Sequence, residues 1–300
     1  MSVTQVTAAS AKAALRLEFF PTELGRCAVR IQGARLRSSS SGAADVYLHG
    51  AAGSWTTFLP LLREAPAHDR VLIDLPGWGD STAGARLEDF SIEAMGRVVV
   101  QVLDALGYRR WNLVGHSMGG FLALHIAADR PELTASVATI SATTFGVHES
   151  IRRPLHGLPF FVGMLLLMRS TAVFGAAGRA LVRALGNTPL MRLLLSPLFA
   201  VPAAIPVDVI RRLAADARPA SFTAAVLAAA RYDLGRWRGI RCPALAIRGD
   251  RDVFTPASDL DRLAQLIPHL QTATIRRCGH FATIEQPAHV TRLLEELGSH

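Results

Sequence analysis

The stretch NLVGHSMGGF, residues 112–121, decides the fold. Its apolar run breaks into a glycine, a histidine, a serine and two more glycines, which is more small residues than a simple strand end requires. A strand, then G-x-S-x-G, then a helix predicts a tight turn with Ser117 at its centre and Gly115 and Gly119 beside it. The turn would expose the serine hydroxyl next to a helix N-terminus. The alternative is a glycine-rich turn in which Ser117 only caps the helix.

The segments around this turn alternate between short apolar runs and amphipathic stretches. A hairpin-like segment, 27–39, opens the series, and helices are expected around 90–107 and after the last strand. The predicted strands are 45–50, 70–77, 109–115, 134–142, 242–250 and 270–280. Continuous apolar strands that alternate with helices predict an α/β fold, a mostly parallel sheet flanked by helices.

The alternation stops between residues 143 and 232, where the sequence is helical throughout and prolines 189, 197, 202 and 206 interrupt it. We interpret 143–232 as a helical cap domain inserted after the sixth strand. The core then consists of 26–142 and 233–300, and 1–25 is an N-terminal extension. The tetraserine at 38–41 is expected to be a loop.

The net charge and the distribution of arginines limit which classes of function are expected. The net charge is +8, and ten arginines between Ile151 and Arg231, against only Asp208 and Asp216, account for the whole excess. Nucleic-acid binding is not expected, because exposed aromatics do not interleave with these arginines and no nucleic-acid-binding module is recognisable. Lysine is nearly absent, so coding bias is one explanation of the arginine content.

Three widely spaced cysteines indicate reduced structural thiols and a cytoplasmic protein, without a disulfide framework. The first twenty residues lack the apolar core of a signal peptide. The most apolar stretches, 158–168 and 193–207, are shorter than the roughly 18 residues of a spanning helix, so no transmembrane segment is expected. No cofactor and no metal site are expected.

Four further motifs accompany the serine turn. They are HGAAGSW (49–55), DLPGWGDS (74–81), RGDRD (248–252) and CGHFATIEQP (278–287). With them the chain resembles the α/β-hydrolase superfamily from about residue 26 onward, in its serine-nucleophile branch with an inserted helical cap. The resemblance implies a catalytic triad in the order Ser117, Asp252, His280. It excludes the branches with an aspartate nucleophile, the haloalkane and epoxide hydrolases.

The triad roles follow from chemistry. A serine hydroxyl is a weak nucleophile and needs a base within hydrogen-bond reach, which His280 would supply. A carboxylate behind the imidazole fixes its tautomer and stabilises its transient positive charge. Asp250 and Asp252 compete for this role. The resemblance favours Asp252, because the family's acid usually lies three residues after the glycine that ends the strand, here Gly249, and Asp250 is expected to bind loop amides instead.

The remaining site residues are expected around Ser117. The resemblance places an oxyanion hole at the backbone N–H groups of Met118 and Ala51, with His49 ordering the loop. Trp55 and Trp78 either line the substrate pocket or belong to the core. The last group of side chains is expected to be structural: His116, His125 and Cys278.

These residues predict a serine hydrolase that cleaves a carboxylic ester or thioester with an apolar acyl or alcohol group through an acyl-enzyme intermediate. A C–C bond hydrolase, a lyase or cyclase, and a ligand-binding protein that reuses the same pocket remain alternatives. The expected partner is a small apolar molecule. The arginines of 143–232 could meet an anionic carrier-protein or coenzyme A thioester, or they are ordinary solvated faces.

Overall fold

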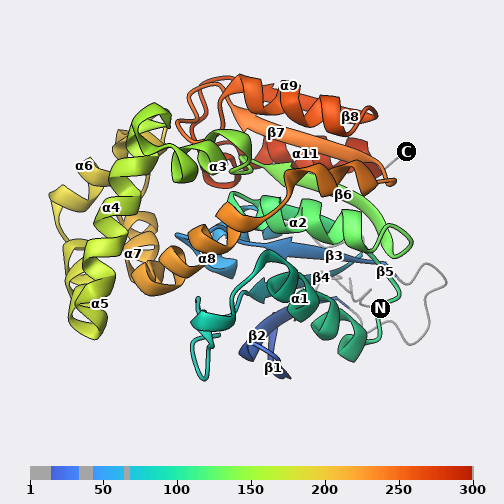
Figure 1. Ribbon diagram of the computed structural model, residues 1–300, viewed down its shortest axis with the longest axis horizontal. Coiled ribbons are helices and arrows are strands. Elements are labelled where there is room, and N and C mark those ends of the chain that lie inside the picture. Colours follow the sequence, from blue (N-terminus) through green and yellow to red (C-terminus); the bar gives the residue numbers. More distant parts are fainter. Residues whose placement is uncertain (1–14, 34–42, 64–67, 299–300) are drawn as a thin grey trace, which may run out of the picture.

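The computed structural model describes residues 15–33, 43–63 and 68–298, and its centre is one eight-stranded sheet (Figure 1). The strand order is β1-β2-β4-β3-β5-β6-β7-β8. The strands are β1 (Arg16–Thr22), β2 (Gly25–Gln32), β3 (Ala43–Leu48), β4 (Asp69–Asp74), β5 (Arg110–His116), β6 (Thr134–Ile140), β7 (Ala244–Gly249) and β8 (Leu270–Ile275). The β1–β2 and β2–β4 pairs are antiparallel and all the others are parallel, which confirms the expected sheet.

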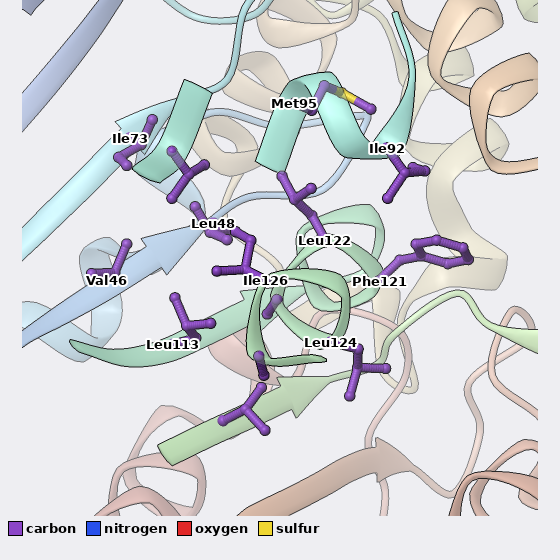
Figure 2. Packing of buried hydrophobic residues seen from close by; sticks show 14 of the residues in the cluster. Val46, Leu48, Ile73, Ile92, Met95, Leu113, Phe121, Leu122, Leu124 and Ile126 are labelled. Atoms are coloured by element: carbon purple, nitrogen blue, oxygen red, sulfur yellow. The ribbon is translucent and has the colours of Figure 1, made fainter. Parts of the chain in front are cut away.

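Both faces of the sheet are buried, because successive side chains of a strand point to opposite faces. In β3, Val46 and Leu48 belong to one hydrophobic cluster and Tyr47 to another. The first cluster packs under α1 (Ile92–Leu106), α2 (Met118–Asp129) and α9 (Ala257–Leu266), as Figure 2 shows for α1 and α2. The second cluster packs under α11 (Pro287–Gly298) and under a 3-10 segment, Trp55–Arg63. A short helix, α10 (Ala282–Glu285), precedes α11. This double cover explains why the parallel strands are apolar without alternation.

Local signals define the ends of α1. The Ser91 side chain accepts a hydrogen bond from the backbone N–H of Ala94 at 3.0 Å, which satisfies one of the free donors of the first turn. At the other end Gly107 has a φ of 84°, the left-handed conformation that glycine adopts without strain. The helix therefore begins and ends where the sequence supplies capping residues.

The chain between β6 and β7 forms a helical insertion, which we define as residues 143–232 (Figure 1). Its helices are α3 (Phe145–Arg152), α4 (Pro159–Val173), α5 (Gly175–Leu185), α6 (Pro189–Leu195), α7 (Val207–Asp216) and α8 (Pro219–Arg231). Prolines start α4, α6 and α8, a position where their missing N–H is not needed. A separate hydrophobic cluster, with Phe161, Val182 and Leu213 among its members, holds these helices together.

The N-terminal part differs from the sequence expectation. A hairpin was expected in 27–39, but the hairpin consists of β1 and β2, and β1 lies inside the range 1–25 that was expected to precede the core. The cause is the edge position of β1: Leu17 and Phe19 are 43% and 42% exposed, so the strand lacks the strong apolar signal of the inner strands. The expected loop at 38–41 lies outside the described residues. Within the described ranges, no helix has the length and apolarity needed to cross a bilayer.

Candidate active site

Ser117 lies at the turn from β5 to α2, with a φ of 55°. A positive φ is uncommon for a residue other than glycine and is held here by the surrounding structure. A Cβ on Gly115 would lie 2.2 Å from the carbonyl oxygen of Gly119, and one on Gly119 would lie 1.9 Å from that of Leu48. The turn therefore requires glycine at both positions, as the spacing in the sequence predicted. Ser117 makes no side-chain cap hydrogen bond to α2, so the capping alternative is wrong.

The structure brings three distant residues into one hydrogen-bonded row. His280, in the loop after β8, has its Nε2 3.0 Å from Ser117 Oγ. Its Nδ1 lies 3.0 Å and 3.2 Å from the two carboxylate oxygens of Asp252, in the loop after β7. The carboxylate fixes the proton on Nδ1, so Nε2 accepts the hydrogen bond from the Ser117 hydroxyl. All three side chains are buried.

The structure also separates the two competing aspartates. Asp252 Oδ1 accepts hydrogen bonds from the backbone N–H of Phe254 at 2.8 Å and of Thr255 at 3.2 Å. Burial alone would raise the pKa of Asp252, but His280, the Phe254 amide and the Ser141 hydroxyl hold the pKa below its usual range. Asp250 is exposed and accepts a hydrogen bond from the N–H of Cys278 at 3.1 Å. Asp250 binds a loop amide, as expected, and does not contact His280.

Two backbone N–H groups lie beside the serine. Gly50 packs so tightly against Ser117 that an added Cβ would lie 2.8 Å from the serine Cβ, which brings the loop after β3 to the turn. Ala51 and Met118 both line the cavity in front of Ser117. Within the described part of the chain, no acceptor takes up the N–H of either residue. Both donors are thus free for a ligand oxygen.

Three histidines near the site have structural contacts. His49 Nδ1 donates to the carbonyl of Gly50 at 2.8 Å, and its Nε2 accepts from the N–H of Leu75 at 3.0 Å. This ties the loop after β3 to the end of β4, as expected. His116 Nε2 donates to the carbonyl of His280 at 2.9 Å, and His125 is hydrogen-bonded to the hydroxyl of Tyr232 at 3.1 Å. None of the three contacts Ser117 Oγ.

The loop that carries His280 is fastened to the helical insertion. The N–H of His280 donates to the carbonyl of Leu198 at 2.8 Å. The Glu285 carboxylate accepts from the N–H of Ala200 at 2.7 Å and from that of Gly279 at 2.8 Å. Phe199 stacks on Phe281 at a centroid distance of 5.3 Å. The segment 198–200 is therefore part of the support of His280.

A largely apolar cavity opens in front of Ser117. Its volume is about 60 Å³, room for roughly five water molecules. Besides Ser117, His280 and the loop after β3, its lining includes side chains of α4, α8 and the loop after β7: Phe161, Met164, Phe222, Val226 and Phe254. Within the described residues, the lining includes no arginine, lysine, aspartate or glutamate. The cavity is suited to an uncharged, apolar group.

The two tryptophans expected as pocket candidates do not line this cavity. Trp78 is fully buried in the core and donates its Nε1–H to the carbonyl of Ala51 at 2.8 Å, so it supports the loop from behind. Trp55 packs under the guanidinium of Arg30, 4.3 Å from its ring centroid. The actual wall comes from α4 and α8. Their apolar residues were visible in the sequence, but which of them face the cavity depends on how the helices pack.

The buried histidines predict a loss of stability in weak acid. Burial lowers the pKa of His116 to about 3 and that of His125 to about 4, against 6.5 for a free side chain. Below pH 6.5 these two histidines therefore become protonated in the unfolded chain while they stay neutral in the folded chain. The free energy of unfolding consequently falls as the pH falls. Each of the two should cost about 1.5 kcal/mol between pH 6.5 and about pH 5.

Urea unfolding at the two pH values measures this loss. In His125→Gln, the difference in the free energy of unfolding between the two pH values should be smaller by the contribution of one histidine. This holds whatever the substitution does to the stability at neutral pH. Equal stability of the native protein at both pH values would contradict the prediction.

Comparisons with known proteins agree with this geometry. Residues 46–287 match the family model described as alpha/beta hydrolase fold. The chain is 30% identical over 283 residues to a 2-hydroxy-6-oxononadienedioate/2-hydroxy-6-oxononatrienedioate hydrolase of Cupriavidus pinatubonensis, which covers 87% of this chain and 89% of the relative. It is 33% identical over 122 residues to epoxide hydrolase 4 of Mus musculus, covering 38% of this chain and 34% of that protein.

A thermophilic esterase from Thermogutta terrifontis has the same fold, with a TM-score of 0.68 at 20% identity over 94% of this chain and 97% of the esterase. The family model spans most of the chain, and the sheet order, the turn at Ser117 and the cavity at the carboxyl ends of the strands fit it. The protein belongs to the alpha/beta hydrolase fold family and is an enzyme of the hydrolase class.

Proposed function

We propose that the protein is a serine hydrolase of apolar carboxylic esters and that 143–232 is the cap over its substrate pocket. The observation that carries the proposal is the row from Ser117 Oγ through His280 to Asp252, with successive contacts of 3.0 Å. These contacts support the arrangement that nucleophilic catalysis requires, with the Nδ1–H of His280 directed to Asp252 and Nε2 accepting from the Ser117 hydroxyl. A serine at this turn also distinguishes the chain from hydrolases that attack with an aspartate.

The reaction would proceed in two balanced steps. Ser117 Oγ attacks the ester carbonyl carbon while its proton passes to His280 Nε2, and the carbonyl electron pair moves onto oxygen. The N–H groups of Ala51 and Met118 would bind that oxyanion. Collapse breaks the bond to the alcohol, which leaves with the proton from His280. A water molecule then repeats the sequence on the acyl-enzyme and releases the acid.

A C–C bond hydrolase is the second candidate, because relatives with that name align over most of this chain. The substrate in the name of these relatives is a dicarboxylate, which bears two negative charges at neutral pH. The cavity lining described above offers neither arginine nor lysine to meet them. Burying a carboxylate without a partner is costly, so the cavity favours an uncharged ester over such a dianion.

The leaving group and the compartment are further parts of the proposal. The leaving group of a coenzyme A or carrier-protein thioester would have to lie outside the apolar cavity. Arg179 and Arg218 line a second cavity between the loop after β4 and the start of α8, where an anionic group would be neutralised. The cytoplasm is the proposed compartment, supported by three buried cysteines that are all free thiols.

We expect kcat/KM on p-nitrophenyl esters to rise a few hundredfold from acetate to octanoate and then to level off as the cavity fills. Each methylene transferred from water contributes about 0.8 kcal/mol, less where the site stays partly wet. Val226→Phe, which fills the cavity, should reduce the gain for octanoate. Leu227→Phe, on the exposed side of the same helix, should not.

Initial rates across the ester series, beside those on a 2-hydroxy-6-oxo dienedioate, test the function. Turnover of the dicarboxylate with a flat ester series would replace the ester proposal with C–C hydrolysis. A flat series in an enzyme that cleaves acetate well would leave the triad in place and contradict the apolar acyl pocket.

A further inference from the structure

Helix α4 is apolar on the side that faces away from the protein. It buries Phe161 and Leu165. Yet Leu166 is 63% exposed, Val173 is 83% exposed and Phe174, which follows the helix, is 69% exposed. Side chains three, four or seven positions apart share one face of a helix, so Leu166 and Val173 lie on the same face of α4, and Phe174 extends the exposed apolar surface directly after the end of the helix. A helix that is apolar all round is normally covered on all sides.

The neighbouring helices continue this pattern. Leu181 of α5 and three leucines of α6 are also exposed. We define the outer apolar surface as these exposed side chains of α4–α6: Leu166, Leu167, Val173, Phe174, Leu181, Leu190, Leu193 and Leu194. The three helices form the end of the molecule remote from the sheet, at the left of Figure 1. Apolar exposure on this scale indicates a surface that another structure covers.

The charged residues of α4–α6 themselves are all of one sign. Between Glu149 and Asp208 the sequence contains no acidic residue but six arginines. Arg169 of α4 and Arg183 of α5 are exposed, and within the described ranges neither has a carboxylate partner. Helices that carry arginines among exposed leucines are suited to bind a partner whose interior is apolar and whose boundary is anionic.

We propose that the outer apolar surface docks onto an anionic lipid bilayer, with the α4–α5 turn at Val173 and Phe174 inserted at headgroup level. Protein interfaces are enriched in tyrosine and tryptophan, and the segment that carries the outer apolar surface, residues 159–195, contains neither. Leucine, valine and phenylalanine with arginines are the composition of helices that lie in a membrane interface. The apolar side chains would contribute most of the free energy of binding to the bilayer, and the arginines would make the protein prefer anionic lipid.

Docking would place the cavity close to the lipid, because α4 separates the two. Phe161 and Met164 line the cavity from one side of this helix, and Leu166 and Val173 face outward from it. Docking does not depend on the reaction proposed above. It is therefore tested on the Ser117→Ala protein, which keeps every residue of the outer apolar surface.

The test is co-sedimentation of Ser117→Ala protein with vesicles of phosphatidylcholine alone and of phosphatidylcholine mixed with phosphatidylglycerol. The protein should sediment with the mixed vesicles, and less so as the salt concentration rises. Val173→Ser with Phe174→Ser should reduce partitioning at least tenfold on both vesicle types. Arg169→Gln with Arg183→Gln should reduce it roughly thirtyfold on the mixed vesicles and little on the neutral ones.

The control is Leu17→Ser with Phe19→Ser, which removes two exposed apolar side chains from the edge strand β1. It should leave vesicle binding unchanged, and thermal unfolding should show that every variant is folded. No sedimentation of the parent protein, or equal loss in the β1 control, overturns the proposal. So does a dimer in sedimentation velocity that Val173→Ser with Phe174→Ser dissociates, since a second copy would then cover this surface.

Discussion

Ser117→Ala is expected to abolish labelling by a fluorophosphonate probe and to lower kcat by about six orders of magnitude. The probe reacts only with a hydroxyl whose proton can pass to a base, and His280 Nε2 lies 3.0 Å from Ser117 Oγ. Intact-protein mass spectrometry should find a single adduct on the native enzyme, and peptide mapping should place it between Gly115 and Gly119.

Ser136→Ala is the matched serine control. Its hydroxyl is also buried, but it is hydrogen-bonded to the side chain of Asn112 on β5, away from the cavity. This variant should label and turn over as the native enzyme does. Labelling that persists in Ser117→Ala would show that another residue is the nucleophile and would defeat the proposed function.

Asp252→Asn is expected to lower kcat by about four orders of magnitude while the protein stays folded. The amide cannot stabilise a charged imidazole, and it can offer an N–H to His280 Nδ1, which favours the wrong tautomer. Both carboxylate oxygens of Asp252 now lie within 3.2 Å of that nitrogen. Single-turnover kinetics on an activated ester, with circular dichroism of each variant, measures the effect.

Asp250→Asn makes the same chemical change two residues earlier and should keep most of the activity. Its side chain accepts a hydrogen bond from the N–H of Cys278 and is exposed, so the amide oxygen can replace it. The reverse ranking of the two variants would move the acid to Asp250. Comparable loss in both would mean that the loop geometry, and not the charge on one residue, governs activity.

The sequence predicted that Ser117, Asp252 and His280 meet, and the structure brings the three side chains together. Turns at the ends of parallel strands need particular small residues, and Gly115 and Gly119 identify the turn before any tertiary contact is known. The resemblance to the α/β-hydrolases supplied the order of the three residues, and parallel strands bring their carboxyl ends to one edge of the sheet.

The cavity wall and the edge strand could not be predicted in this way. Trp55 and Trp78 follow the right strands, yet one packs under an arginine and the other supports a loop from behind. Whether a side chain of α4 or α8 faces the cavity is settled by how the insertion packs, which local spacing does not encode. The strand β1 was not predicted because it lies at the edge of the sheet and is largely exposed. It therefore lacks the continuous apolar run that identifies the inner strands.

The fastening at Leu198 and Ala200 makes the insertion and the base one mechanical unit. If the insertion moved away as a rigid body, it would remove the acceptor of the His280 N–H and one donor to Glu285. A movement of the insertion that left His280 aligned with Ser117 would therefore have to leave the segment 198–200 in place.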